Sequence, residues 1–179
     1  MKLLNQQKIL KESMIMIREM LICDAITTVL VKVSDDLILN AILISLKSEN
    51  DNEREEAIET MKIFENKNEI ADNKFDETFN LMIDRLKDHI PHIRIAASLI
   101  IANLIAKHPQ QTIIDEKLSE IVLSIDDESE DIRNAIHDLI LSISKSDRLK
   151  PNLLDILKKQ QNYHPEAEDL CKEIIAALE

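Results

Sequence analysis

The 179-residue chain contains no glycine and no tryptophan, and aromatic residues make up only 2% of it. Tight β-hairpins depend on glycine-type turns, and strands favour aromatic and β-branched pairs. Isoleucine is abundant, but it recurs at three- and four-residue spacings instead of alternating. Such spacings are typical of helices that bury one face. The sequence therefore predicts an all-α protein.

Cysteine and positive charge are also scarce. Cys23 and Cys171 lie near opposite ends of the chain, which suits neither a disulfide framework nor a metal cluster and favours a reducing, cytoplasmic location. The formal net charge is −12, whereas proteins that bind nucleic acid through its phosphates need a basic face. The apolar runs are short and punctuated, so none is expected to span a membrane. We expect no nucleic-acid partner, no membrane partner and no cofactor.

The apolar spacing predicts ten helices in five antiparallel pairs, joined by polar turns. Three prolines, Pro91, Pro151 and Pro165, stand near expected helix starts, where a missing N–H costs nothing. The expected helices cover residues 3–23, 24–33, 37–47, 53–65, 75–87, 91–107, 113–125, 130–145, 149–160 and 165–178.

A repeat with a period near 40 residues runs through the sequence. Arg54, Arg94 and Arg133 are 40 and 39 residues apart, and three apolar columns keep the same steps: Ala57, Ala97 and Ile136; Met61, Ile101 and Ile140; Phe64, Leu104 and Ile143. A two-helix unit of this period predicts a short α-α superhelix, or solenoid, whose units bury their apolar faces against their neighbours. We expect one domain, 1–179, with capping helices at 1–35, three central repeats at 36–147 and a capping pair at 148–179.

Two turns of this repeat resemble those of the HEAT-repeat family. Asp88 is followed six residues later by Arg94, and Asp127 by Arg133, with alanine close behind each arginine. The resemblance implies a ladder of hydrogen bonds between adjacent units, formed by the turn aspartate and the arginine that opens the second helix. It is specific for the fold and much less so for function, because such scaffolds serve many partners.

The outer repeats depart from this pattern. Arg54 is preceded by Ser48 where the family has aspartate, and Asn162 and Glu168 depart at both positions. We therefore expect the ladder to be confined to the middle of the array.

The second helix of the central repeat is apolar almost all the way round. Where its neighbours in the repeat mostly carry polar or charged residues, it carries an apolar stripe. Second helices line the concave surface in HEAT-like solenoids, so the resemblance implies that this stripe lies on the floor of a groove. The hypothesis assigns partner binding to the stripe Ile95, Leu99, Ala102 and Ile105, with an acidic rim of Glu55, Glu59 and Asp138.

Three interpretations of this stripe remain open. It docks a helix or peptide of another protein, with the acidic rim favouring a basic partner. It makes a homodimer, or it is covered within the monomer and only completes the core. Docking is the function that we expect, which makes the protein a non-enzymatic scaffold; a HEAT-type enzyme that acts on a modified base or protein side chain is the third and least favoured hypothesis for the function.

Other candidate sites have simpler interpretations. The acidic run 126–131 lacks the bend and the ligand spacing of a calcium loop and fits the positive end of the following helix. The five histidines include no His-Glu step of the kind that HEAT-type iron enzymes use, so we expect no metal site. Neither cysteine has a neighbouring histidine, and we expect no catalytic residue. The methionine-bearing first helix, with Met14, Met16 and Met20, is expected to pack as a cap, although a partner or membrane-surface role is the alternative.

Overall fold

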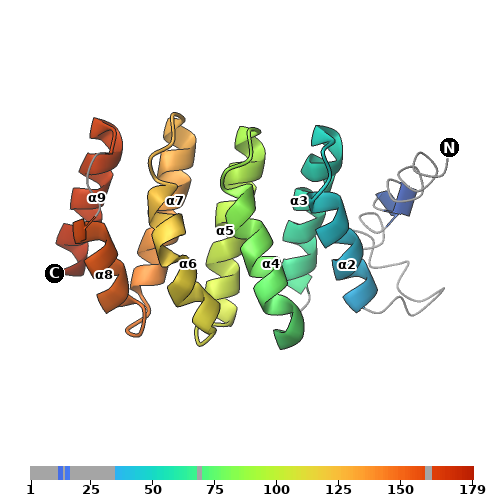
Figure 1. Cartoon of the computed structure of the whole chain (residues 1–179), viewed down its shortest axis with the longest axis horizontal. Coiled ribbons are helices and arrows are strands. Elements are labelled where there is room, and N and C mark those ends of the chain that lie inside the picture. The colour runs from blue at the N-terminus through green and yellow to red at the C-terminus, as the bar shows by residue number, and fades with distance from the viewer. Residues whose placement is uncertain (1–11, 14, 17–34, 68–69, 160–162) are drawn as a thin grey trace. The chain divides into compact units, whose positions relative to one another are not determined.

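The computed structural model describes residues 12–13, 15–16, 35–67, 70–159 and 163–179. Within these ranges the chain forms helices and no strand, which confirms the all-α prediction (Figure 1). The helices are α2 (Asp35–Leu46), α3 (Asp51–Lys67), α4 (Asp72–Arg85), α5 (Pro91–Lys107), α6 (Thr112–Leu123), α7 (Glu130–Ser144), α8 (Lys150–Lys159) and α9 (Pro165–Leu178).

The helix ends agree with the predicted ends to within three residues, and α5 and α9 begin and end where predicted. The expected helices at 3–23 and 24–33 lie outside the described residues, except for residues 12–13 and 15–16, which are helical. Among the described residues, no helix combines the length and the hydropathy that crossing a membrane requires.

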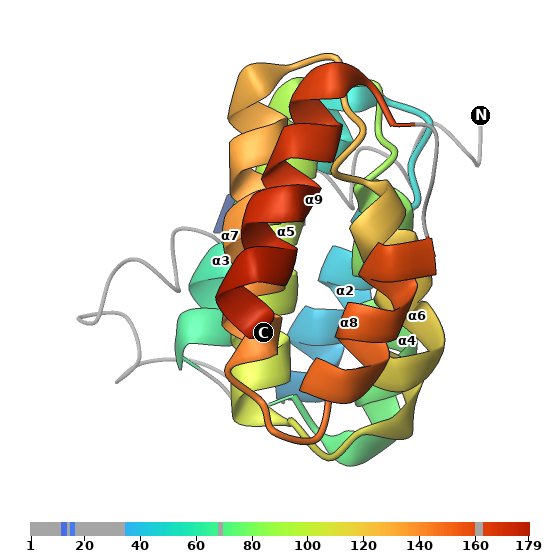
Figure 2. The same cartoon turned by 90° about the vertical axis from the view of Figure 1, so that its left-hand side faces the viewer.

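The chain divides into two compact units, Met1–Phe75 and Asp76–Glu179, with the boundary inside α4. In the first unit, α2 packs on α3. In the second unit, α5 packs on α7 and α7 on α9, while α6 packs on α8. Alternate helices of the second unit therefore form two layers, with α5, α7 and α9 in one and α6 and α8 in the other (Figure 2).

The three apolar columns of the repeat are buried in every repeat. Ala57, Met61 and Phe64 are at most 1% exposed in the first unit, and the α5 and α7 residues of the same columns are fully buried in the second. These columns were identified from a 40-residue period alone, and burial of a regular apolar face is what drives such helices to pack. The prediction of core positions is confirmed for all nine residues.

Helices α6 and α7 end without glycine because their last turns tighten. Ser124 after α6 and Lys145 after α7 keep right-handed helical dihedrals, with φ, ψ of −70°, −8° and −72°, −12°. The next N–H groups donate to the carbonyls three residues earlier, as in Ile125 to Val122 at 3.2 Å. Such 3₁₀-type closures satisfy terminal carbonyls with no left-handed residue, which is the position that usually demands glycine.

Candidate functional site

Three turns, each leading into the second helix of a repeat, share one hydrogen-bonding pattern. At the first position of each turn, a side-chain oxygen accepts from the backbone N–H two residues later. The pairs are Ser48 Oγ with Asn50 at 3.1 Å, Asp88 Oδ1 with Ile90 at 3.1 Å and Asp127 Oδ1 with Ser129 at 2.9 Å. Serine and aspartate both make such local turns, so Ser48 keeps the turn although it lacks the carboxylate.

The repeat arginines add a second bond to each turn. In every case Nη1 donates to the backbone carbonyl of the first turn position, six residues back. The pairs are Arg54 with Ser48 at 3.0 Å, Arg94 with Asp88 at 2.7 Å and Arg133 with Asp127 at 2.8 Å. One local geometry thus recurs at three turns.

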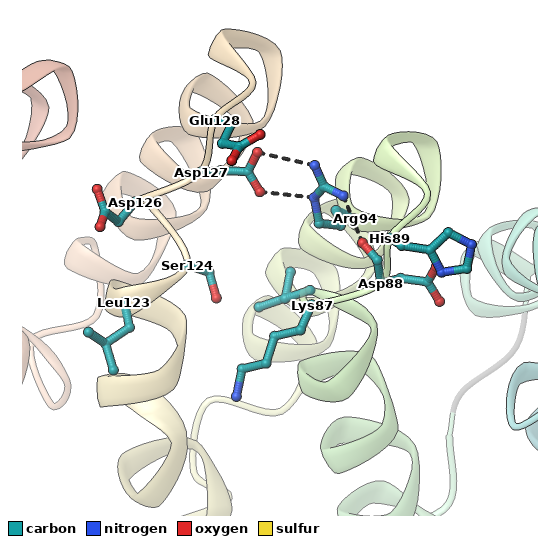
Figure 3. A pocket seen from close by; sticks show the side chains of 10 residues that line it. Lys87, Asp88, His89, Arg94, Leu123, Ser124, Asp126, Asp127 and Glu128 are labelled. Atoms are coloured by element: carbon teal, nitrogen blue, oxygen red, sulfur yellow. Dashed lines mark hydrogen bonds and ion pairs between the residues drawn. The ribbon is translucent and has the colours of Figure 1, made fainter. Parts of the chain in front are cut away.

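A bond between successive turns is formed by Arg94 (Figure 3). Its Nη2 donates to Asp127 Oδ1 at 3.1 Å, and its Nε lies 2.9 Å from Oδ2 of the same carboxylate. The two side chains are only 15% and 16% exposed, so this two-point ion pair is well shielded from water. It links the turn before α5 to the turn before α7, as the expected ladder requires.

The other ladder residues also make local bonds. Arg54 donates to Asp51 in its own helix at 2.8 Å, and the Asp88 carboxylate pairs with Arg85 at 3.0 Å. Arg133 donates to the carbonyls of Asp127 and Glu128. Asn162 lies outside the described residues.

Arg148, which lies between α7 and α8, binds the segment between α5 and α6. Its Nε donates to the carbonyl of Pro109 at 2.9 Å, and its Nη1 pairs with the carboxylate of Asp115. The sequence analysis did not single out Arg148. It stands one repeat length from the segment that it binds, so turns at both ends of the second unit are held by arginine.

A cavity of about 430 Å³ lies beside the Arg94–Asp127 pair (Figure 3). Its lining mixes both signs of charge with two leucines, Leu86 and Leu123. Lys87, which is also in the lining, pairs with Glu120 of α6 at 3.1 Å. This cavity is the gap between two turns that are held together by ion pairs, and it gathers no set of groups typical of catalysis.

A second hollow, of about 300 Å³, is an open groove between α5 and α7. It contains three of the residues predicted for partner binding, Leu99, Ala102 and Asp138. The lining is completed by Ser98 of α5 and by Asp131, Asn134, Ala135 and Leu139 of α7. We take this groove, called the α5–α7 groove below, as the candidate functional site.

The predicted stripe is only partly a surface feature. Leu99 is 51% exposed, whereas Ile95 and Ala102 are half-buried. Ile105 is 4% exposed and therefore cannot anchor a partner, which corrects the hypothesis at that position. Its place in the stripe was inferred from Glu65 and Ser144 in the neighbouring repeats, yet Glu65 is itself buried. Positions 65 and 105 of this column are therefore buried, although the column contains polar residues.

The predicted acidic rim is also divided. Glu55 and Glu59 are half-buried in the first unit, where Glu59 pairs with Lys62 at 3.1 Å. Asp138 has a side chain that is 82% exposed, in the second unit. The other acidic residue that lines the groove is Asp131, which also belongs to α7.

Apart from Asp138, the groove residues on α7 were missed by the sequence analysis, although their spacing could have identified them. Asp131, Asn134, Ala135 and Asp138 follow one another at steps of three, one and three, which places them on one helical face. The alignment between repeats compared single columns and did not trace this face along α7.

Groups that would support catalysis are not gathered here. Among the described residues, no three His, Cys, Asp or Glu side chains are arranged to hold a metal ion. Cys171 is buried, and burial raises the pKa of its thiol to about 11, with Asp126 and Glu168 adding to the shift. A thiol in that state is protonated at neutral pH and is a poor nucleophile. Burial likewise raises the pKa of the nearby Tyr163 hydroxyl. Cys23 lies outside the described residues.

Comparisons of the chain with protein-family models, with curated proteins and with solved structures find no match.

Proposed function

We propose that the protein is a non-enzymatic, HEAT-like α-solenoid that binds a helix or peptide of another protein in the α5–α7 groove. The observation that carries the proposal is Leu99, a large aliphatic side chain that is half exposed at the edge of a groove of about 300 Å³. Grooves of this kind, between packed helices, are a recurrent binding mode for amphipathic helices.

The solenoid part of the proposal is supported by the repeated local geometry. Three turns share two side-chain hydrogen bonds at a spacing of 40 and 39 residues. In the second unit, each helix packs on the helix two places along the chain, as α5 does on α7 and α7 on α9. This next-but-one packing is what stacked two-helix repeats produce.

The energetic contribution of Leu99 is modest but useful. Fully burying a leucine contributes about 1.5–3 kcal/mol, and about half of this side chain is still exposed. Covering the rest is therefore worth about 1 kcal/mol. Ala102 and Ala135 line the same groove, and their small side chains let a partner backbone approach closely. We expect a weak interface in which Leu99 is the main apolar anchor.

Substitution of Leu99 by glutamate tests the proposal. Leu99 is exposed, so Leu99→Glu should retain the helical circular dichroism spectrum while it weakens the binding of amphipathic helical peptides at least about tenfold. Leu123 is 49% exposed at the end of α6, so Leu123→Glu is a matched control that should leave binding unchanged. Equal binding by both variants, measured by fluorescence anisotropy, would refute the groove.

A homodimer through the same groove is the alternative, and charge disfavours it. Asp131 and Asp138 would face the same residues of the second copy across a two-fold axis, and like charges in contact are repulsive. Sedimentation that shows a dimer of the wild type and a monomer of Leu99→Glu would favour this alternative over binding to another protein.

The proposal has two further parts: the protein has no enzymatic role, and it is located in the cytoplasm. Cys171 is a free thiol with a raised pKa, which fits a reducing compartment and a structural cysteine. Turnover that depends on a groove residue such as Asp138 would overturn the non-enzymatic part.

A further inference from the structure

Resting on groove binding as proposed above, we propose that the partner is a cationic amphipathic helix. It carries lysine or arginine at two positions seven residues apart, with a large aliphatic residue midway between them. The proposal is carried by two aspartates on one face of α7 and by the apolar floor between them.

The two aspartates define the spacing. Asp131 and Asp138 line the same groove and are both exposed. Seven residues correspond to two helical turns, a rise of about 10 Å. A partner helix that lies along α7 presents its own residues i and i+7 at nearly the same separation. One cation therefore reaches each carboxylate.

Neither aspartate is neutralised by a cation within the described part of the chain. Asp138 lies beside His137, whose Nδ1 is 3.6 Å from Oδ1. The facing helix α5 has no lysine or arginine between Arg94, which binds Asp127, and Lys107 at its end.

Several acids elsewhere in the same unit are paired. Glu120 contacts both Lys87 and Lys117, at 3.1 and 2.6 Å, and the hydrogen bond from Lys117 lowers the pKa of Glu120. Asp155 pairs with Lys159. Asp131 and Asp138 differ from these acids in having no lysine or arginine partner among the described residues.

A purely structural role accounts for only one of the two aspartates. Asp131 lies in the first turn of α7, where an acid stabilises the helix through its dipole. Asp138 lies in the middle of α7, where aspartate is a poor helix former. Its 82% exposed side chain gains no compensating lysine or arginine from the described residues. Charge complementarity with a partner gives this position a function.

The floor between the aspartates selects the middle of the partner. Ala102 and Ala135 are small, and Leu99 stands beside them. A large aliphatic residue at position i+3 or i+4 of the partner, on the same face as its two cations, fits over the alanines and contacts Leu99. Asn134 lies between the aspartates and can bond a polar residue next to that position.

The test compares two helical peptides that share one aliphatic face and differ only in the pair at i and i+7. One carries lysine at both positions and the other carries glutamate. We expect the lysine peptide to bind about tenfold more tightly by fluorescence anisotropy. We also expect that preference to shrink as salt screens the rim charges.

The variant Asp131→Asn/Asp138→Asn should reduce the preference to less than about threefold. The matched control is Glu116→Gln/Asp155→Asn, which changes the net charge equally on α6 and α8 and should keep the preference. Both variants replace exposed residues, and circular dichroism checks that they fold.

The outcomes separate this inference from the proposed function. If both peptides bind equally and Leu99→Glu abolishes both, groove binding stands and the cationic partner is refuted. If the control variant loses the preference as the groove variant does, net charge and not the groove is responsible, and the inference is also refuted. If neither peptide binds, the proposed function fails with it.

Discussion

The Arg94–Asp127 pair offers the sharpest test of how the repeats are held together. Arg94 makes a two-point contact with Asp127 and a third bond to the Asp88 carbonyl. Breaking a buried ion pair costs about 3–5 kcal/mol, whereas an exposed one is worth about 0.2–1 kcal/mol. With both side chains about 15% exposed, we expect Arg94→Ala to lower the free energy of unfolding by about 2–3 kcal/mol.

Arg133 provides the matched comparison. It makes the same bond to its own turn but donates only to backbone carbonyls. Arg133→Ala should therefore cost only about 1 kcal/mol. Asp127→Asn removes the charge while the amide oxygen still accepts from Ser129, so it isolates the ion pair from the turn.

Urea unfolding of the single and double variants, followed by circular dichroism because the chain has no tryptophan, gives the coupling energy. We expect Arg94→Ala and Asp127→Asn to couple by about 1–2 kcal/mol. A coupling energy below about 0.3 kcal/mol, or an Arg133→Ala cost equal to that of Arg94→Ala, would refute the ladder as the link between turns.

Three further predictions concern single positions. Ser48→Ala should lower the free energy of unfolding by about 1 kcal/mol, and Ser48→Asp should also lower it, because the aspartate makes the same turn but its carboxylate faces Glu53, to which the Ser48 hydroxyl donates at 2.6 Å; urea unfolding measures both. Arg148→Ala should cost about 1 kcal/mol, and added salt should reduce that cost because the pair with Asp115 is partly exposed; a salt-independent cost would contradict this origin. In a Cys23→Ser background, Cys171 should react with a thiol reagent only slowly at pH 8. The folded-state pKa of Cys171 lies near 11, above the ordinary 9.0, so stability should fall between pH 9 and 11; fast labelling at pH 8 would contradict this.

The sequence was sufficient for most of the fold. Apolar spacing and the proline positions located every described helix, because each helix buries one regular face and the turns carry their own hydrogen bonds. The 40-residue period identified the buried columns for the same reason. Ser48 shows where motif matching was too strict, since its hydroxyl performs the local part of the aspartate's role.

The candidate site could be predicted only in part. Leu99 was singled out as an apolar residue in a polar column, and it is exposed. Ile105 was placed in the same stripe, but it is buried. The polar residues in its column did not prove that the column is exposed, since Glu65 is buried too. Asp131 and Asn134 reach the groove through the packing of α5 on α7. That packing depends on tertiary contacts that no single helix pattern contains.

The central claim, that the α5–α7 groove docks a partner helix, is tested most directly by titrating the lysine peptide into isotope-labelled protein and recording amide chemical shifts. We expect the largest shifts at Leu99, Ala102, Ala135 and Asp138, with small shifts at Leu123 on α6. Shifts that are absent, or that centre on the α6 and α8 layer, would contradict the claim.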